Sequence, residues 1–417
     1  MNVLVTGSAG FLGRNVVQFL KTLADKRNHT RPNLSIGEIY EYDKDSKLEL
    51  LNEYCAKADF VFNLAGVNRP ENPTEFKEGN FRFASQLLNA LKKYNNTCPV
   101  MLSSSLQATL SGRYGESEYG RSKLAGENLF FDYAKETGAV IYVYRYPNLV
   151  GRGVKPNYNS AVGTWCYNYA HDLPIQINDL NVELELLFVD DLIQELLDAM
   201  EGHPHRCEYP TPHQIINGIE YDGLTPRPID NGQYCYCPVT HKVTLRRIIE
   251  LLDSFKIQPQ NFMVPDLTPC SFEKKLYSMY ISYLPKEKMS IPFKMNVDSR
   301  GSFTEILHTQ SAGQVSVNVC APGHIRRGEH WHSTKLEWFI VVSGHGLIRE
   351  RNIVTGEIVE FEVFGDKIEA VIMVPGWTHS IENLSETEKL VTIMWANENF
   401  IPECPETYYE PVLREGK

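Results

Sequence analysis

A tyrosine and a lysine four positions apart form the first candidate site for proton transfer. Tyr119 and Lys123 lie at the start of a predicted helix, and residues four apart lie on one face of a helix. An ammonium group nearby lowers the pKa of a phenol, so Tyr119 could donate or accept a proton near neutral pH. Upstream, the run Ser103-Ser104-Ser105 follows a predicted strand and offers hydroxyls that could hold a substrate oxygen. A tyrosine and a lysine at this spacing are common on solvated helix faces. The pair therefore indicates catalysis only if other motifs of the chain support it.

Glycines near the start of the chain form a second candidate site. The run TGSAGFLG, from Thr6 to Gly13, connects a β-branched segment to a helical apolar pattern. Glycine permits a tight turn and a close approach of the backbone to a pyrophosphate, and the following helix N-terminus offers free amide groups. The position therefore predicts a dinucleotide-binding loop. The residues expected to contact the cofactor there are Gly7, Gly10, Phe11, Leu12 and Gly13.

Two residues after the second predicted strand bear on the choice of cofactor. Asp43 could accept hydrogen bonds from a free ribose, which favours NAD. Lys44 could pair with a 2′-phosphate, which favours NADP. Both could also be ordinary surface turn residues, so these residues alone leave the choice open.

Histidines in the last third of the chain indicate a different chemistry. His330 and His332 alternate on a predicted strand and so point to one face, and Glu337 follows after four residues. His379, in the run PGWTH, could add a third imidazole. Three imidazoles and a carboxylate suit a divalent metal such as zinc, iron, nickel or manganese, and we expect zinc.

The tyrosine and glycine sites need a parallel sheet to position them, and the apolar pattern predicts one. Short β-branched runs alternate with helical apolar patterns, which is typical of an α/β doubly wound (Rossmann) domain. The predicted strands are 2–6, 39–42, 59–64, 100–103 and 140–144, and the predicted helices are 15–24, 47–57, 76–94, 119–136, 243–255 (capped by Thr244) and 274–284.

The histidines lie in a region with a different pattern. From 296 to 398, short strand-like runs separated by turns predict an all-β domain with a closed double sheet. We place the boundary near 288, which gives one domain at 1–287 and another at 288–417. Within the first domain, the segment 203–240 is rich in Pro, His, Gly and Tyr without a clear period, so we expect an irregular excursion there.

The composition excludes some classes of function. A net charge of −11 argues against general nucleic-acid binding, which needs a positive face. Nine cysteines at irregular spacing fit reduced thiols better than a disulfide framework, and the pair Cys235 and Cys237 is a poor zinc site without a second pair. No apolar run reaches the roughly 18 residues of a membrane span, and the first residues read as a strand, not a signal peptide. We therefore expect a cytoplasmic protein.

Together, the motifs of the first half resemble the extended short-chain dehydrogenase/reductases, which act on nucleotide sugars. The matching landmarks are TGSAGFLG, NLAG at 63–66, SSS at 103–105, YGRSK at 119–123, RYPNLVG at 145–151 and FVDD at 188–191. The resemblance implies that Tyr119 is the acid/base, that Lys123 positions the nicotinamide ribose, and that Ser105 contacts the reacting oxygen. It further implies cofactor contacts at Leu64, Ala65 and Gly66, and substrate contacts at Lys155, Asn157 and Asn159.

The second half resembles two related groups of proteins. The histidines match the two motifs of the metal-binding cupins (double-stranded β-helix), which implies ligands at His330, His332, Glu337 and His379. The runs 298–303 and 327–330 resemble the deoxysugar epimerases related to dTDP-4-keto-rhamnose 3,5-epimerase, which implies that His330 is a catalytic base and that Arg300 and Arg327 contact substrate. A ligating lone pair cannot also accept a proton, so the two roles of His330 compete.

The order of the two halves is similar to fused reductase–cupin enzymes of bacterial capsule synthesis. The supporting runs are NRPE at 68–71, KPNYNS at 155–160, NVDSRGSFTE at 296–305 and VTIMWANE at 391–398. The resemblance implies a cupin that epimerises carbon 3 of a UDP-4-keto-6-deoxy-N-acetylhexosamine and a reductase that reduces carbon 4 with NADPH. The product would be UDP-N-acetyl-6-deoxy-L-talosamine, a precursor of N-acetyl-L-fucosamine. This favours NADP, with Lys44 as its partner, and we expect a homodimer.

Two other functions compete with this interpretation. An NAD-dependent dehydratase or 4-epimerase with a non-catalytic cupin is disfavoured, because such dehydratases carry Thr-Asp-Glu where this chain has Ser105-Leu106-Gln107. A nucleotide-sugar sensor is disfavoured because a sensor has no need of the Tyr119 and Lys123 pair.

Overall fold

The chain folds into two compact units. The computed structural model describes residues 1–67, 77–265, 268–309, 313–399 and 406–413. Unit 1 comprises Met1–Glu250 with Ser278–Tyr283, and unit 2 comprises Leu251–Tyr277 with Leu284–Lys417. Across these described residues, no helix combines the length and apolarity that a bilayer crossing requires.

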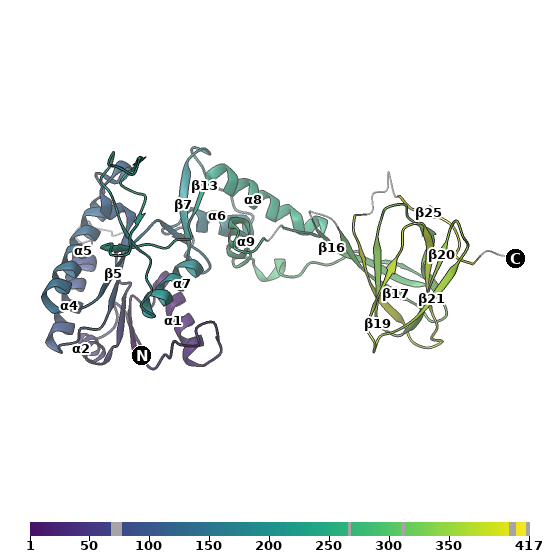
Figure 1. The fold of residues 1–417 in the computed structure, drawn as a ribbon, viewed down its shortest axis with the longest axis horizontal. Coiled ribbons are helices and arrows are strands. Elements are labelled where there is room, and N and C mark those ends of the chain that lie inside the picture. The colour runs from purple at the N-terminus through teal and green to yellow at the C-terminus, as the bar shows by residue number, and fades with distance from the viewer. Residues whose placement is uncertain (68–76, 266–267, 310–312, 400–405, 414–417) are drawn as a thin grey trace. The chain divides into compact units, whose positions relative to one another are not determined.

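Unit 1 is built on a parallel sheet with the strand order β5-β4-β3-β1-β2. Figure 1 labels β5 in this sheet, with helices α4 and α5 beside it. These strands are β1 (Val3–Thr6), β2 (Ile39–Tyr42), β3 (Phe60–Asn63), β4 (Val100–Ser105) and β5 (Ile141–Tyr146). The order reverses direction at β1, and the crevice beside such a reversal is where doubly wound sheets bind ligands. The predicted Rossmann architecture is confirmed.

Helices cover both faces of this sheet. The residues of β1 alternate, so that Val3 and Val5 pack in one apolar cluster and Leu4 packs in the other. The first cluster includes α1 (Phe11–Ala24) and α7 (Val189–Met200), and the second includes α2 (Leu48–Lys57), α4 (Phe83–Lys93) and α5 (Glu118–Thr137). The sheet is therefore buried on both faces, as a parallel sheet requires.

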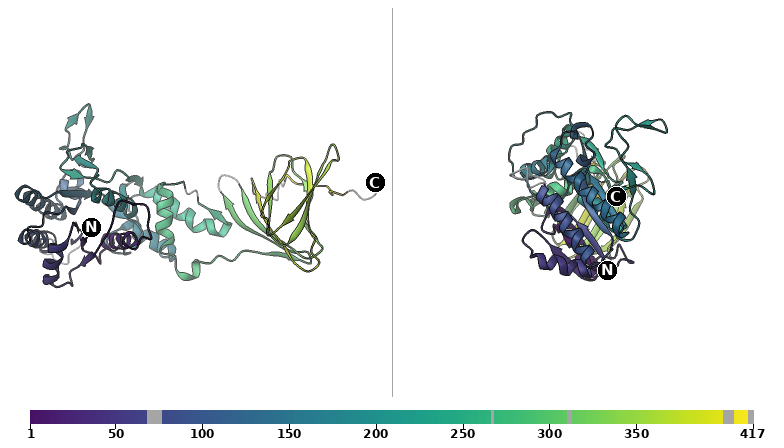
Figure 2. Two further views of the ribbon diagram at one scale, coloured as in Figure 1. Left: turned by 60° about the horizontal axis from the view of Figure 1, so that its bottom comes forward. Right: turned by 90° about the vertical axis from the view of Figure 1, so that its left-hand side faces the viewer.

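The segment 203–240 is more regular than we expected. Three of its strands extend the main sheet beyond β5, and two more form a separate hairpin that projects as a teal ribbon in the left-hand view of Figure 2. The sheet strands are β8 (Arg206–Glu208), β11 (Arg227–Pro228) and β12 (Tyr234–Cys235), and the hairpin strands are β9 (Ile215–Ile216) and β10 (Ile219–Glu220). The prediction of an irregular excursion is wrong in this respect, because strands of two or three residues are too short to show a period.

Other helix boundaries also differ from the predicted ones. The helix predicted at 76–94 divides into a π-helical turn, Lys77–Arg82, and α4. The helix predicted at 243–255 is preceded by strand β13 (His241–Thr244) and runs as α8 over Leu245–Ile257, with Thr244 Oγ1 accepting the Arg247 N–H as a cap. Further elements are β6 (Asn148–Val150), α6 (Ala161–Ala170), β7 (Glu183–Phe188) and α9 (Phe272–Ile281), with β13, β7 and β6 forming a small sheet.

Unit 2 contains two facing sheets, ordered β14-β16-β17-β24-β19-β22 and β21-β20-β23-β18-β25, with β15 paired to β16. Its core lies between them and includes Phe339, Ile348, Ile381 and Leu390. All of their pairings except β14–β16 are antiparallel. The strands are β14 (Met263–Val264), β15 (Asn296–Asp298), β16 (Gly301–Thr309), β17 (Gln314–Cys320), β18 (Ile325–Trp331), β19 (Glu337–Ser343), β20 (His345–Asn352), β21 (Ile358–Phe364), β22 (Ala370–Met373), β23 (Trp377–Asn383), β24 (Leu390–Ala396) and β25 (Tyr408–Tyr409). The predicted double sheet is confirmed.

A buried ion pair joins α5 to β5 in unit 1. Arg145 Nη2 and Nε lie 2.6 and 3.0 Å from the two carboxylate oxygens of Glu127, and both side chains are almost fully buried. The Ser104 hydroxyl of β4 donates to the same carboxylate. Arg145 also donates to the Tyr234 hydroxyl at 2.9 Å and lies over the Tyr234 ring. One carboxylate–guanidinium pair thus links a helix, two parallel strands and the segment 203–240.

Removing one member of this pair should destabilise unit 1. The Glu127→Gln variant leaves the Arg145 charge buried without a carboxylate, which typically costs about 3–5 kcal/mol of unfolding free energy. Denaturant unfolding of the full chain measures this loss. The control Glu53→Gln removes an exposed helical pair with Lys57 and should change the midpoint little. Equal midpoints for the two variants would show that the buried pair does not hold unit 1 together.

Candidate functional sites

The glycine loop packs tightly against the end of β3. Gly7 has φ +68°, and a Cβ atom there would lie 2.7 Å from the Ala65 nitrogen. A Cβ atom on Gly13 would lie 2.1 Å from the Gly7 oxygen. Only glycine fits at either position, so the loop is held close to the predicted cofactor residues at 64–65. Phe11 and Leu12 open α1, whose N-terminus follows Gly10.

Asp43 is bound to the glycine loop. Its carboxylate accepts the Ala9 N–H at 2.7 Å and the Lys44 N–H at 2.8 Å. The Lys44 side chain is exposed beside it. The Asp43 carboxylate therefore helps to hold the loop, and the Lys44 ammonium is open to solvent.

The Tyr119 and Lys123 pair lies at the start of α5, where the Ser117 hydroxyl accepts the Gly120 N–H as a cap. Lys123 is buried, and its Nζ donates to the Ser103 carbonyl at 3.0 Å and lies 5.7 Å from the centre of the Tyr119 ring. A Cβ atom on Gly66 would come within 3.0 Å of this Nζ, so the end of β3 also reaches the pair.

The pKa values of this pair are shifted by burial. Burial lowers the pKa of Lys123 to about 8, against the opposing effect of the Glu127 carboxylate. Burial also raises the pKa of Tyr119 above its ordinary value. The expected lowering of the phenol pKa is wrong for this structure, because the ammonium lies over the ring and desolvation of the phenol dominates. Tyr119 is therefore protonated at neutral pH and suited to donate a proton.

The three serines after β4 have different environments. The Ser104 side chain is buried and donates to Glu127 in the core. Ser105 is only half-buried, and its Oγ accepts the Gln107 N–H at 3.2 Å. Because neighbouring residues of a strand point to opposite faces, Ser105 projects away from the Glu127 side.

Asn80 is a further polar residue near Lys123 that the sequence analysis did not find. Its Oδ1 accepts the Val67 N–H at 2.9 Å, and its Nδ2 donates to the Val67 carbonyl at 3.2 Å and to the Ser122 Oγ at 3.1 Å. A Cβ atom on Gly66 would be 3.0 Å from the Asn80 Oδ1. Asn80 thus ties the end of β3 to α5. The residues around Asn80 in the sequence form no motif that would predict this role.

The predicted substrate residues of unit 1 lie on the loop between β6 and α6. Lys155 is exposed with its Nζ 5.7 Å from the centre of the Tyr158 ring, and Asn159 is also exposed. Asn157 has φ +56°, and its N–H donates to the Thr164 Oγ1 at 2.9 Å. Their contact with substrate stays a prediction.

The four predicted ligands of unit 2 converge. One ligand atom from each of His330, His332, Glu337 and His379 lies within 4.8 Å of those of the others. The Glu337 Oε2 is 3.5 Å from His332 Nε2 and 3.4 Å from His379 Nε2. Nε2 of His332 and both ring nitrogens of His379 are buried without a hydrogen-bond partner. Buried lone pairs that face one another and a carboxylate fit a divalent metal.

The backbone fixes how two of these imidazoles point. His330 Nδ1 lies 2.9 Å from the Gly328 carbonyl, and His332 Nδ1 lies 2.8 Å from the Glu406 carbonyl. Each carbonyl holds a proton on Nδ1 and leaves Nε2 as the ligand atom, which is how protein metal sites orient their histidines. Although burial alone would raise the pKa of Glu337, the neighbouring imidazoles of His332 and His379 hold it well below its usual value.

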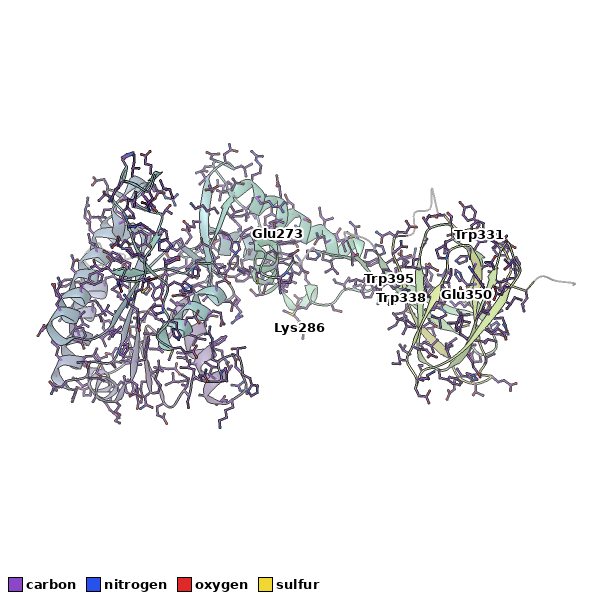
Figure 3. All side chains as sticks on the ribbon, in the orientation of Figure 1. Glu273, Lys286, Trp331, Trp338, Glu350 and Trp395 are labelled. Atoms are coloured by element: carbon purple, nitrogen blue, oxygen red, sulfur yellow. The ribbon has the colours of Figure 1, made fainter. Side chains whose placement is uncertain are left out.

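A C-terminal strap, residues 406–412, lies beside the end of β18, the strand that carries His330. β25 pairs with β18 at His330 and Trp331, and the Trp331 ring, which Figure 3 labels, stacks on Tyr408 at 4.4 Å. Arg351 of β20 donates to the Val412 and Pro411 carbonyls at 2.9 Å. The strap was not predicted, because its residues form no motif.

The two predicted substrate arginines of unit 2 differ. Arg300 lies in the exposed turn before β16, and its Nη2 donates to Asp298 at 2.8 Å. Arg327 is half-buried on β18, with its guanidinium 3.4 Å from the centre of the Phe303 ring. Burial, with the neighbouring Arg326, lowers the pKa of Arg327 to about 10. The positive charge of Arg300, whose side chain is exposed, adds to this lowering.

Cys235 and Cys237 lie in the apolar core of unit 1. Burial raises the pKa of Cys235 to about 12. Neither belongs to a cluster of potential metal ligands among the described residues. Both are therefore thiols outside any disulfide that pack in the core.

Two family models match the chain. That of the NAD dependent epimerase/dehydratase family matches residues 3–207, and that of the polysaccharide biosynthesis C-terminal domain matches residues 296–408. The first family supports a nicotinamide cofactor for unit 1.

Full-length relatives share both halves. A UDP-2-acetamido-2,6-beta-L-arabino-hexul-4-ose reductase of Pseudomonas aeruginosa is 35% identical over 408 residues, 98% of each chain. The crystal structure of the capsular polysaccharide assembling protein CapF from Staphylococcus aureus superposes with a TM-score of 0.82 and 43% identity, covering 99% of this chain and 100% of that one. A CDP-paratose 2-epimerase of Salmonella typhi is 25% identical over 214 residues, 40% of this chain and 63% of its own.

Cofactor binding should depend on the close approach at Gly13. The Gly13→Ala variant places a methyl group against the Gly7 oxygen and forces the loop open, so reduced nicotinamide dinucleotide should bind at least about tenfold more weakly, a free-energy loss of about 1.4 kcal/mol. Fluorescence titration measures the affinity. The control Gly115→Ala meets only ordinary contacts beyond 3.7 Å and should bind normally. Equal affinities in both variants would contradict this role of the loop.

Proposed function

Because the chain belongs to the family of CapF proteins and UDP-2-acetamido-2,6-beta-L-arabino-hexul-4-ose reductases, we propose that it is a bifunctional nucleotide-sugar enzyme. Unit 2 epimerises carbon 3 of a UDP-4-keto-6-deoxy-N-acetylhexosamine, and unit 1 reduces carbon 4. The product is UDP-N-acetyl-6-deoxy-L-talosamine, for capsule or O-antigen synthesis. The observation that carries the proposal is the presence, in one chain, of half-buried Tyr119 beside buried Lys123 and of a cluster of three histidines and a glutamate.

In the reductase half, Tyr119 is the proton donor. A reduced nicotinamide supplies the hydride that reaches carbon 4, and the carbonyl oxygen then needs a proton. The Tyr119 phenol, whose pKa is raised by desolvation, holds that proton at neutral pH. Lys123 holds the nicotinamide ribose, and the Ser105 hydroxyl binds the carbonyl oxygen, since Ser104 is committed to Glu127.

The cofactor of this half is NADPH. Asp43 is already hydrogen-bonded to the Ala9 and Lys44 amides, which leaves its carboxylate less free for ribose hydroxyls. The exposed Lys44 ammonium stands beside it and can pair with a 2′-phosphate. Contacts from Gly7, Gly10, Phe11, Leu12 and Gly13, and from Leu64, Ala65 and Gly66, complete the site.

In the cupin half, one divalent metal ion, which we expect to be zinc, is held by His330, His332, Glu337 and His379. Such an ion polarises a carbonyl oxygen and so makes a neighbouring hydrogen more acidic. His330 acts as a ligand in this proposal, because its Nδ1 faces the Gly328 carbonyl and its Nε2 faces the other ligands. The base that removes the proton is then another group. Arg300 and Arg327 bind the substrate, with Arg327 stacked on Phe303.

The order of the two reactions follows from their chemistry. The hydrogen on carbon 3 is acidic only while carbon 4 is a ketone, because the ketone oxygen takes up the charge left behind. Reduction removes the ketone. Epimerisation must therefore precede reduction.

We further propose a homodimer formed through the outer face of unit 2. Trp395, Trp338 and Ile372 are neighbours across three strands of one sheet, and Figure 3 labels both tryptophans. Trp338 and Ile372 are exposed by 39% and 48%. A row of large apolar side chains on an outer face is typical of an interface.

Substitution should separate the two activities. Tyr119→Phe removes the proton donor and should lower the rate of carbon-4 reduction by about 10²–10⁴-fold, while solvent deuterium still enters carbon 3. Absorbance of the reduced nicotinamide measures the first reaction, and NMR of the sugar measures the second. A variant that lost neither activity, or lost both, would overturn the division between the units.

Metal content should follow the histidine cluster. The purified chain should contain about one divalent metal ion, and His332→Ala should lose it together with carbon-3 exchange. The control His345→Ala removes an outward-facing imidazole that stacks on Phe364 and should keep the metal. Elemental analysis of the three proteins decides the matter, and full metal content in His332→Ala would refute the ligand assignment.

A further inference from the structure

Unit 1 contains a cavity of about 340 Å³ that borders the loop after Ser105. Leu106, which directly follows Ser105, lines it, together with Tyr114 from the same loop. Asn148 and Glu185 line it from β6 and β7. Because ligand pockets range upward from about 300 Å³, this cavity suits one sugar ring rather than a whole nucleotide sugar.

The remaining wall of the cavity comes from a turn in the segment 203–240. Asp222, Leu224 and Thr225 line the cavity from this side. The Asp222 carboxylate accepts the N–H groups of Leu224 and Thr225 at 2.8 and 2.7 Å. These two hydrogen bonds fix the shape of the turn, so this wall of the cavity has a defined backbone conformation.

The turn is pressed against the loop that follows Ser105. Gly223 is buried with φ +80°, and a Cβ atom there would lie 2.5 Å from the Ser111 Oγ and 2.8 Å from the Pro212 Cγ. A Cβ atom on Gly112 would lie 3.7 Å from the Leu224 Cδ1, so the Leu224 side chain packs against the same loop. The close fit sets where Leu224 stands relative to Leu106.

The base of the segment is held with equal firmness. The Tyr209 and Tyr234 rings both lie against the Arg145 guanidinium, whose carbon is 5.1 and 3.9 Å from the two ring centres. Arg145 forms the buried ion pair with Glu127, and Glu127 lies on α5, the helix that also carries Tyr119. The base of the segment 203–240 and helix α5, which carries Tyr119, therefore both contact the buried Arg145–Glu127 pair.

We propose that the segment 203–240 determines which sugar the reductase half accepts as substrate, with Leu224 as the specificity-determining residue. This inference rests on the proposed function. The cavity combines two leucines with polar side chains, which are the Asn148 amide, three carboxylates, and the cationic groups of Arg113 and Lys242. A deoxy sugar has matching features, since its hydroxyl and acetamido groups form hydrogen bonds and its methyl group is apolar. Leu224 and Leu106 contact the methyl group of carbon 6 and disfavour a hydroxymethyl group in its place.

Kinetics on the full chain test this role. Leu224→Ala should raise the KM for the 4-keto-6-deoxy sugar about tenfold, the usual effect of a lost methyl contact in a pocket, and leave kcat within about twofold. The matched control Ile215→Ala changes a 69% exposed residue on the hairpin of the same segment and should behave as the unchanged protein. Gly223→Ala, which disturbs the turn through its contact with Ser111, should also raise KM.

A competition assay keeps the test valid if a variant folds poorly. The ratio of rates for the 6-deoxy and 6-hydroxy forms of the UDP-4-keto-N-acetylhexosamine does not depend on how much enzyme is folded. Leu224→Ala should narrow this ratio, and Leu224→Met should preserve it. An unchanged ratio in Leu224→Ala, with active parent enzyme, overturns the inference alone. A parent enzyme that reduces neither sugar overturns the proposed function itself.

Discussion

The reductase half depends on a charge that cannot be left unpaired. Arg145 lies in the core of unit 1, where an isolated guanidinium would be very costly, and Glu127 is placed to neutralise it. The partners of this pair determine much of the site. Ser104 is drawn into the core by Glu127, which leaves Ser105 on the other side of β4. Tyr234 is held by Arg145, which brings the segment 203–240 onto the sheet. Helix α5, the serine run 103–105 and the segment 203–240 are therefore all held in place by contacts with this one ion pair.

Unit 2 solves a related problem in a different way. Its buried polar groups are imidazoles and one carboxylate, gathered where they can share a cation. Backbone carbonyls fix two of the imidazoles, and Gly328 makes the necessary close approach, since a Cβ atom there would lie 2.2 Å from the His379 oxygen. In both units the reactive side chains gain their positions from groups that take no part in the chemistry. Glu350, which lies opposite His379 on β20 and is labelled in Figure 3, accepts the Val374 N–H and belongs to this supporting set.

The sequence predicted the fold and the motif residues because these depend on local patterns. Glycine spacing, the alternation of strand-like and helical patterns in the first half and the repeat of short strands after 296 are all visible within short stretches of sequence. The supporting groups could not be predicted in this way. Asn80, Glu127 and Glu406 act through contacts between segments 13 to 74 positions apart, which no short pattern encodes. Likewise, the pKa of Tyr119 depends on how deeply its ring is buried, and spacing to Lys123 suggested the opposite direction.

The strap at 406–412 has a consequence for biosynthesis. A ribosome releases residues in chain order, and domains tend to fold as they emerge. The glycine loop, α5 and the segment 203–240 are all available long before the last strand of unit 2. The carbonyl that orients His332, however, belongs to Glu406, and the partner of β18 is β25. The histidine cluster can therefore reach its final geometry only after residues 406–412 have left the ribosome, so a nascent chain can form its nucleotide-binding fold before it forms this cluster.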